Sequence, residues 1–243
     1  DVLGSRGLGD VYKRQVDEIG DIGTAEINLV MRQEGLPAAE VLKNKFDMPF
    51  VVSAPYGYAA TLAWLEEVGK ILGQLPDVKM CARLRLKAQN TASLKMYAMM
   101  MGRKKTPQAA VIGEYDLVKG LSAFLRSVGI DVKYKLCSHS LKSIVEPELD
   151  IRYISVEKEK IDILKKLQKT LVLADDVSHR LCDSSNVVLR VSAPFIDGAQ
   201  IATHLPLLGE KGTDFLLETI EAYYQTLACL LYTSPSPRDP KTS

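Results

Sequence analysis

The fold is decided by Gln108-Ala-Ala-Val-Ile-Gly113, a short apolar run that is followed at once by a helical repeat. The repeat consists of apolar residues at helical spacing, namely Leu117, Leu121, Phe124, Leu125 and Val128. Gly129 then stands where a helix commonly ends, and the next strand is predicted at Val132–Cys137. Two predicted strands joined by an amphipathic helix are typical of a βαβ unit, whose strands are parallel.

The same alternation extends in both directions from this unit. Further strands are predicted at Glu26–Met31, Met48–Ala54, Leu171–Ala174 and Asn186–Val191. Helices are predicted at Leu36–Phe46, Val78–Met101, Glu157–Lys169 and Asp175–Cys182, with another around residues 60–71 and a last one capped by Thr213. The alternation favours an α/β fold of Rossmann-like parallel sheets with flanking helices. The basic stretch Gly102–Pro107 divides it into one partial domain, residues 16–103, and one complete domain, residues 104–228.

The two ends of the chain, residues 1–15 and 229–243, do not continue this pattern. One permissible coding sequence for Ser5–Gln15 has a reverse complement that encodes Cys229–Arg238. Agreement over about ten codons in opposite orientations indicates one DNA segment, inverted at the two ends as a sequencing-library adaptor would be. We therefore expect both ends to be adaptor-derived and the natural part to be a fragment of a longer, metagenomic protein.

Composition and charge exclude several classes of protein. Of the 243 residues, 47% are hydrophobic and 25% are charged, as in globular domains. The formal net charge of +1 gives no electrostatic signature of nucleic-acid binding, and no apolar run approaches the ~20 residues of a membrane-spanning helix. Four cysteines without a Cys-x-x-Cys spacing favour a reduced, cytoplasmic protein.

Metal-binding and nucleophilic signals in the sequence are weak. His179 and Cys182 are three residues apart on a short predicted helix, but two ligands are too few for a zinc site. Cys137 and His139 lie on one face at the end of a strand, yet no orienting carboxylate is apparent beside them. The sequence therefore predicts neither a metal ligand nor a catalytic residue in this chain.

Two loops that follow strands are better candidates for binding a ligand, because open α/β sheets bind ligands beyond the carboxyl ends of their strands. Pro55, Tyr56 and Gly57 belong to the first loop. Ser192 and Pro194 belong to the second. We predict that these five residues contact a cofactor or substrate, with ordinary strand-to-helix turns as the alternative.

Around these loops the chain resembles the nitrogenase component 1 family. Its first half carries Gly35–Phe50, Ala54–Gly57 and Thr61–Leu65, which are similar to the helix, strand, Pro-x-Gly turn and following helix common in that family. Its second half resembles the family's third domain at Ala110–Glu114, Gly120–Ile130, Thr170–Asp175 and Arg190–Phe195. The resemblance covers most of the chain, with its segments in the family's order.

The resemblance implies a cytoplasmic subunit that pairs with a homologous sister subunit and receives electrons from an ATP-dependent iron–sulfur reductase. It also implies an iron–sulfur or other metal cofactor in the full complex. The family's cofactor cysteine would fall near Met31 and its cofactor histidine near Ser192, and neither residue replaces a thiolate or an imidazole. The cysteines of the family's bridging cluster belong to the first part of its chain, so cluster ligands are expected upstream of this fragment.

The leading hypothesis is a fragment of a nitrogenase-like oxidoreductase subunit that takes part in ATP-dependent reduction and is inactive alone. One alternative is a cofactor-assembly scaffold of the same fold that has no turnover. A second alternative is a metal-free α/β module that binds a small molecule. Neither nucleic acid nor a membrane is expected as a partner.

Overall fold

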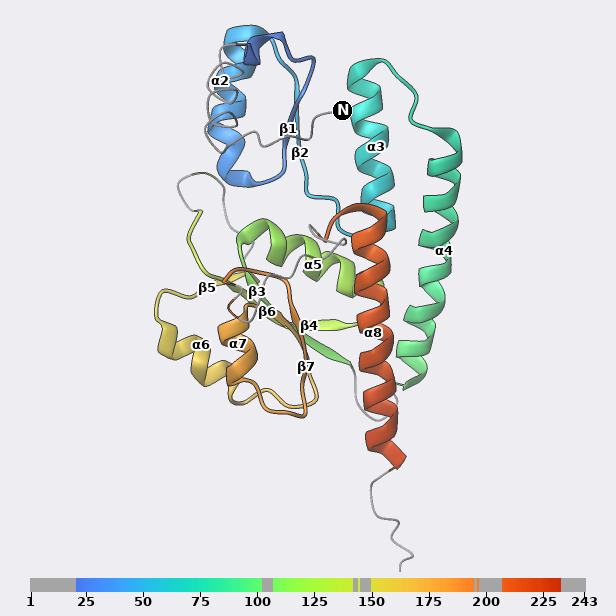
Figure 1. Ribbon diagram of the computed structural model, residues 1–243, viewed down its shortest axis with the longest axis vertical. Coiled ribbons are helices and arrows are strands. Elements are labelled where there is room, and N and C mark those ends of the chain that lie inside the picture. The colour runs from blue at the N-terminus through green and yellow to red at the C-terminus, as the bar shows by residue number, and fades with distance from the viewer. Residues whose placement is uncertain are drawn as a thin grey trace, which may run out of the picture.

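The computed structural model describes residues 21–101, 107–141, 144, 150–194, 196 and 207–232, of which 92–95, 97–101 and 226–232 are described by their backbone alone. Two parallel sheets with flanking helices make up this part of the chain (Figure 1). The smaller sheet pairs β1 (Asn28–Val30) with β2 (Phe50–Val52), and α2 (Leu36–Phe46) connects the two strands. The α/β class expected from the sequence is confirmed.

The larger sheet has five parallel strands in the order β5-β4-β3-β6-β7. These strands are β3 (Gln108–Gly113), β4 (Asp131–Cys137), β5 (Arg152–Tyr153), β6 (Leu171–Ala174) and β7 (Val187–Arg190). The helices between them are α5 (Tyr115–Ser127), α6 (Glu157–Leu164) and α7 (Asp176–Leu181). The chain first moves outward from β3 to β4 and β5 and then returns to the other side of β3, so the strand order reverses between β3 and β6.

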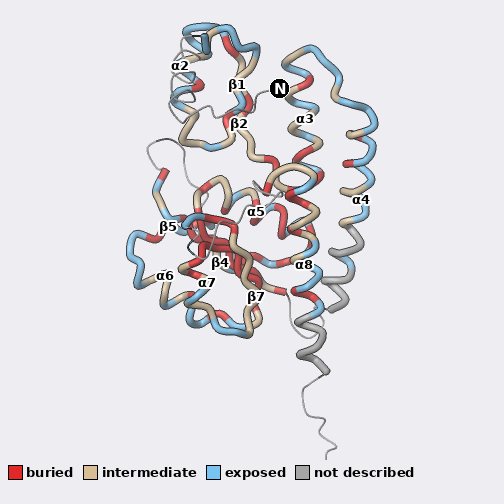
Figure 2. The backbone as a smooth tube through the Cα atoms, viewed as in Figure 1, coloured by how far each residue is buried: buried red, intermediate tan, exposed pale blue. Residues whose placement is uncertain are grey.

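Alternate residues of β3 enter two separate cores on the two faces of the larger sheet, as the pleat of a strand requires. Ala109 and Val111 belong to the core that includes residues of α5 and the last helix. Ala110 and Ile112 belong to the core that includes Leu164 of α6. Figure 2 shows the buried backbone concentrated in this sheet. Burial on both faces explains why the central strands β3 and β6 are nearly continuous apolar runs.

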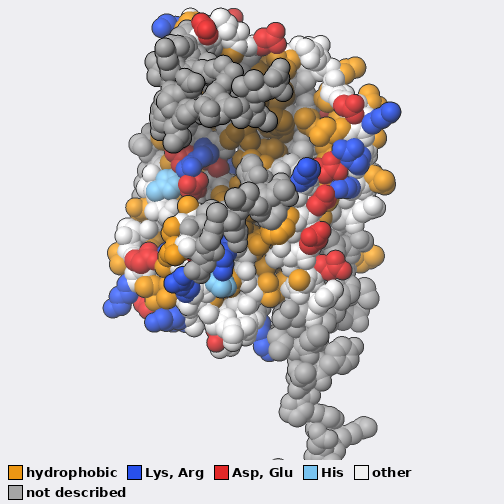
Figure 3. All heavy atoms as spheres, viewed as in Figure 1, with side chains coloured by type: hydrophobic (Ala, Val, Ile, Leu, Met, Phe, Trp, Pro, Cys, Tyr) orange, Lys and Arg blue, Asp and Glu red, His pale blue; other side chains and the backbone are white. Residues whose placement is uncertain are grey.

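Three helices lie side by side next to the sheets: α3 (Tyr58–Leu72), α4 (Val78–Met101) and α8 (Gly209–Tyr232). Arg83 of α4 pairs with Glu210 of α8 at 2.8 Å, and Lys87 pairs with Asp214 at the same distance. Figure 3 shows acidic and basic side chains intermixed on the surface over these helices. The ion pairs join the helices that follow the smaller sheet to the last helix.

The structure corrects two predicted helix boundaries. The helix predicted at Glu157–Lys169 ends at Leu164, where the backbone N–H groups of Lys166 and Leu167 donate to the carbonyls three residues earlier, at 3.0 and 3.2 Å, in place of the four-residue spacing of an α-helix. The last helix begins at Gly209 and not at Thr213, which lies inside it and donates its hydroxyl to the Gly209 carbonyl at 2.6 Å.

The apolar side chains of α2, at Leu36, Ala39, Val41, Leu42 and Phe46, are largely unburied. The helix has the predicted bounds, but Ala39 is its buried residue, while Val41 is 61% exposed and Phe46 is 42% exposed. A sheet of two short strands covers too little of the helix to bury a full stripe.

The predicted domain boundaries stay predictions. Residues 102–106, where the first boundary falls, lie outside the described residues, as do residues 1–15. Helix α8 runs through the second predicted boundary, at residues 228 and 229, without interruption. Within the described ranges, no helix has the length and apolar character that crossing a membrane requires.

Candidate functional site

The carboxyl ends of β3, β4, β6 and β7 surround a crevice of about 140 Å³. We call it the strand-end crevice, and its polar lining includes Glu114, Ser138, Lys160, Asp175 and Ser192. It lies where the strand order reverses between β3 and β6, which is the position at which open α/β sheets bind ligands. The topology therefore marks this crevice as the candidate site.

Ser192, one of the residues predicted to contact a ligand, lines the strand-end crevice. Its Oγ donates to the Ile112 carbonyl at 3.2 Å. Gly113 gives it room, because a Cβ at that position would lie 3.2 Å from the Cβ of Ser192. Pro194 is exposed, and its carbonyl accepts from the backbone N–H of Asp176 at 3.2 Å. The structure thus places Ser192 in the crevice and uses Pro194 at the start of α7.

Another part of the crevice lining is charged. Lys160 Nζ lies 2.7 Å from Glu157 Oε1 and 3.7 Å from Asp175 Oδ2. Asp175 is buried and caps α7, accepting from both the backbone N–H of Ser178 at 2.8 Å and its hydroxyl at 2.9 Å. A ligand in the crevice would meet one cation and two carboxylates on this side.

A charged cluster beside the crevice connects the smaller sheet to the larger one. It joins the turn after β1 to the turns after β3 and β4. Arg32 Nη1 pairs with Glu114 Oε2 at 2.8 Å, and the backbone N–H of Gln33 donates to Asp116 Oδ2 at 2.7 Å. Glu34 Oε1 lies 2.8 Å from His139 Nε2. We call Arg32, Glu34, Glu114, Asp116 and His139 the bridging cluster.

The bridging cluster corrects the expectation that no carboxylate orients His139. Glu34 contacts the imidazole although it is 105 residues away in the chain. Its carboxylate accepts from Arg32 Nη2 at 2.8 Å, and this hydrogen bond chiefly lowers the pKa of Glu34 to about 2. Asp116 responds oppositely, since burial raises the pKa of its carboxyl. The cluster therefore combines a firmly ionised carboxylate with one that binds protons more readily.

Cys137 is unsuited to act as a nucleophile beside His139. Its Sγ donates to the carbonyl of His139 at 3.0 Å, and burial raises the pKa of the thiol. A thiol is far less nucleophilic than a thiolate. In the Cys–His pair considered from the sequence, the sulfur of Cys137 therefore contacts the backbone carbonyl of His139 and not its imidazole.

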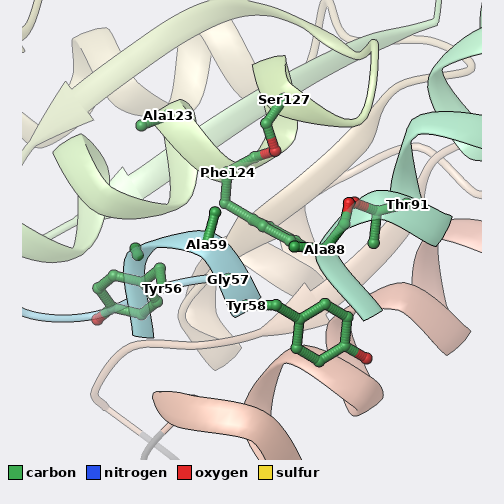
Figure 4. Close-up of a pocket in the computed structure, with 10 residues that line it drawn as sticks. Tyr56, Gly57, Tyr58, Ala59, Ala88, Thr91, Ala123, Phe124 and Ser127 are labelled. Atoms are coloured by element: carbon green, nitrogen blue, oxygen red, sulfur yellow. The ribbon is translucent and has the colours of Figure 1, made fainter. Parts of the chain in front are cut away.

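The loop of Pro55, Tyr56 and Gly57 leads to a second cavity of about 430 Å³. The carbonyl of Pro55 accepts from the backbone N–H of Gly209 at 3.1 Å. Tyr56 and Gly57 line the cavity, whose other walls come from α3, α4 and α5 (Figure 4). The five residues predicted to contact a cofactor or substrate are thus divided between two cavities and the starts of α7 and α8.

Three hydroxyl groups in the second cavity, those of Tyr58, Thr91 and Ser127, are engaged in hydrogen bonds. Thr91 donates to the Ala88 carbonyl and Ser127 to the Phe124 carbonyl, both at 2.6 Å. Tyr58 donates to Asp214 of α8. Alanine, phenylalanine and tyrosine carbon atoms therefore make up most of its surface (Figure 4).

The described residues do not fit an iron–sulfur cluster or another metal cofactor as direct ligands. No three His, Cys, Asp or Glu side chains within the described ranges are grouped as a metal site would require. Cys182 follows α7. Burial raises the pKa of its thiol to about 11, with a smaller contribution from the negative charge of Asp175. Met31 and Ser192 supply a thioether and a hydroxyl where the resemblance implied a thiolate and an imidazole.

Comparisons with known proteins agree with the resemblance found in the sequence. A family model described as nitrogenase component 1 type oxidoreductase matches residues 11–224. A light-independent protochlorophyllide reductase subunit of Methylocella silvestris is 25% identical over 215 residues, covering 84% of this chain and 41% of that protein. The nitrogenase iron-iron protein beta chain of Rhodobacter capsulatus is 25% identical over 223 residues, covering 84% of this chain and 46% of that one. The chain thus spans less than half the length of these relatives.

A solved structure shares the fold. Nitrogenase Cp1 at pH 6.5 matches 89% of this chain and 48% of its own chain, with a TM-score of 0.65 and 15% sequence identity. At this identity the likeness concerns the fold alone. The family match covers both sheets and the helices that join them. The chain belongs to the nitrogenase component 1 type oxidoreductase family.

Proposed function

We propose that the chain is part of a component 1 subunit that takes part in ATP-dependent reduction, with electrons supplied by an iron–sulfur reductase. The family match over residues 11–224 is the observation that carries the proposal. Two relatives named for protochlorophyllide reduction and for nitrogenase support the reaction class. The substrate is a molecule that accepts electrons and protons together.

In this proposal the strand-end crevice contacts the group that is reduced or a cofactor next to it. Its position at the reversal of strand order supports this role. Ser192 supplies a hydroxyl, and Lys160 supplies a cation that would oppose negative charge on a ligand. Tyr56 and Gly57 are assigned to the walls of the second cavity, and the carbonyl of Pro55 joins the loop before α3 to the start of α8.

The chain's own contribution is to enclose and orient, because the described residues do not fit a metal cofactor as ligands. We propose that an iron–sulfur or other metal group of the full complex is held by residues beyond those described. When bound there, such a group would supply the electron-transfer chemistry. The bridging cluster would keep the loops of the smaller sheet in place over the crevice.

The proposed partners are a homologous sister subunit and the ATP-dependent iron–sulfur reductase. We propose a cytoplasmic complex, which the free thiols of Cys81, Cys137 and Cys182 support. Nucleic acid and membranes are not among the proposed partners.

A second candidate function is a cofactor-assembly scaffold of the same fold. The thioether of Met31 and the hydroxyl of Ser192 favour this function, because both are weak metal ligands and a scaffold must release the cofactor that it carries. A metal-free binding module is a third possibility, consistent with the polar crevice. The three candidates differ in whether electrons enter the complex and whether iron stays bound.

The deciding experiment uses the full-length subunit purified with its sister subunit. Iron content is measured first, and ATP-dependent electron uptake from the iron–sulfur reductase is measured next. The proposed reductase retains iron and accepts electrons only when ATP is hydrolysed. A scaffold gives up its metal cargo to an acceptor protein without electron uptake, and a complex with neither property contradicts both redox roles. The chain of residues 1–243 alone is expected to bind no iron stoichiometrically.

A further inference from the structure

We propose that His139 delivers protons to a ligand in the strand-end crevice through the hydroxyl of Ser138, with Glu34 orienting the imidazole. The inference rests on the proposed function, because reduction consumes protons together with electrons. It gives His139 and Glu34 of the bridging cluster a chemical role in addition to their proposed role of holding the loops of the smaller sheet. His139 and Ser138 act as the proton path, and Glu34 is a positioning residue.

The imidazole of His139 lies between two polar side chains. Its Nε2 is 2.8 Å from Glu34 Oε1, and its Nδ1 is 3.4 Å from Ser138 Oγ. Ser138 lines the strand-end crevice, where its hydroxyl also donates to the Gly113 carbonyl at 3.2 Å. The side chain of His139 is 36% exposed, so solvent reaches the ring. One ring thus connects solvent with a hydroxyl group of the crevice.

The ionised state of Glu34 determines which ring nitrogen can exchange a proton. The hydrogen bond from Arg32 chiefly lowers the pKa of Glu34 to about 2, so near neutral pH its oxygens only accept. Nε2 must therefore carry a hydrogen in both the neutral and the charged imidazole. The proton that histidine gains or loses is then the one on Nδ1, which faces Ser138.

Other charged groups near the ring are committed to other partners. On the same turn as Glu34, Arg32 pairs with Glu114 of the turn after β3. Asp116 accepts from the backbone N–H of Gln33, and Cys137 of β4 donates to the carbonyl of His139 and not to its ring. Among the described residues, Glu34 is therefore the direct ionic partner of the imidazole.

The proposed step balances one proton against one electron. The electron comes from the iron–sulfur reductase and reduces an atom of the ligand. The Ser138 O–H bond breaks and its proton passes to that atom, while the Nδ1–H bond of the imidazolium breaks and its proton passes to Ser138 Oγ. His139 is left neutral with Nε2–H still on Glu34, and solvent returns a proton to Nδ1.

Nitrogen NMR of the full chain with labelled histidine tests the orientation directly. The His139→Gln variant assigns the His139 signals. We expect the neutral ring to carry its hydrogen on Nε2, favoured about tenfold or more by the charge-assisted hydrogen bond to Glu34. The Glu34→Ala variant should increase the Nδ1–H form, whereas His179→Gln, on α7, should leave the His139 signals unchanged. A ring that carries its hydrogen mainly on Nδ1, or that ignores Glu34→Ala, would overturn the proposal.

Turnover of the complete complex tests proton delivery, with protochlorophyllide as the substrate probe and the reductase with ATP as the electron source. His139→Gln and Ser138→Ala should each slow reduction by about 100-fold, the low end for removal of an acid–base group, and should alter the pH profile. Ser138→Thr retains the hydroxyl and should restore the rate. Unchanged rates and pH profiles in the first two variants would overturn the proton path. A wild-type complex without turnover on any reducible probe would contradict the proposed function, while the NMR measurement still decides the orientation of His139.

Discussion

Gly57 is the residue at which one methyl group should be most harmful to the loop of Pro55, Tyr56 and Gly57. Its backbone has φ 91° and ψ 158°, a region that is essentially restricted to glycine and costs other residues ~1–3 kcal/mol. A Cβ there would lie 2.8 Å from Cδ2 of Phe124, which is 5% exposed. Overpacking of this kind costs a further ~1–3 kcal/mol.

Alanine also stiffens the unfolded chain, which returns ~0.4–1 kcal/mol of stability. We therefore expect Gly57→Ala to lower the free energy of unfolding by about 3 kcal/mol. The matched control is Gly73→Ala at the end of α3, where φ is 63° and no atom lies within 4 Å of the added Cβ. The left-handed backbone at residue 73 costs alanine ~1–2 kcal/mol, and the stiffer unfolded chain offsets part of this cost. The net loss in the free energy of unfolding should therefore be about 1 kcal/mol or less.

Urea unfolding followed by tryptophan fluorescence measures both variants. Trp64 is the one tryptophan of the sequence and lies on α3, the helix that Gly57 precedes. The carbonyl of Gly57 accepts from the backbone N–H of Thr61 at 3.0 Å, so displacement of the loop should reach the start of this helix. If the two variants lose equal stability, the reasoning on the Gly57 backbone and its contact with Phe124 is refuted.

Three further predictions concern the core, the bridging cluster and a buried thiol. Leu121→Ala removes a fully buried side chain between the larger sheet and α8, and should lower the free energy of unfolding by ~2–5 kcal/mol in the same urea assay; a loss under 1 kcal/mol would contradict this packing. Glu34 has a folded pKa of about 2 against an ordinary 4.5, so it stabilises the fold above pH 4.5, and this contribution is lost as the pH falls toward 2. Glu34→Gln should therefore be less stable than wild type at pH 7 and equally stable near pH 2, and a difference in stability independent of pH would argue against the contact. Cys137 should resist iodoacetamide at pH 7 and react in urea, as mass spectrometry of its peptide can establish; rapid reaction in the native protein would contradict its burial.

Local patterns were sufficient to predict most of the elements. The strand Gln108–Gly113 and the helix after it occur as expected, because burial on both faces of a sheet leaves an apolar run and burial of one helix face leaves a helical repeat. The strand β5 was missed because it has only two residues, Arg152 and Tyr153, which leave no pattern. Thr213 was taken for a cap although Gly209, four residues earlier, begins the helix.

The candidate site was predictable only in part. Ser192 was selected from the sequence because it follows a strand, and ligands of open α/β sheets bind beyond the carboxyl ends of strands. Its place in the crevice also depends on the order of the strands in the sheet. The contact between Glu34 and His139 joins turns that follow β1 and β4, so no sequence spacing signals it. The same holds for the second cavity, where Gly57 and Tyr56 meet residues of α4 and α5 that only the packing of helices brings near.

The most direct test of the account is electron uptake by the complete complex when the strand-end crevice is filled. Ser192→Leu places a larger side chain into the crevice, and Gln168→Leu places the same side chain at an exposed position before β6, at the amino ends of the strands. With the iron–sulfur reductase and ATP, we predict that substrate reduction falls at least tenfold in Ser192→Leu and is unchanged in Gln168→Leu, with both variants folded as judged by a wild-type Trp64 emission spectrum. Equal reduction in the two variants would contradict the assignment of the crevice, and no ATP-dependent electron uptake in wild type would contradict the reductase function itself.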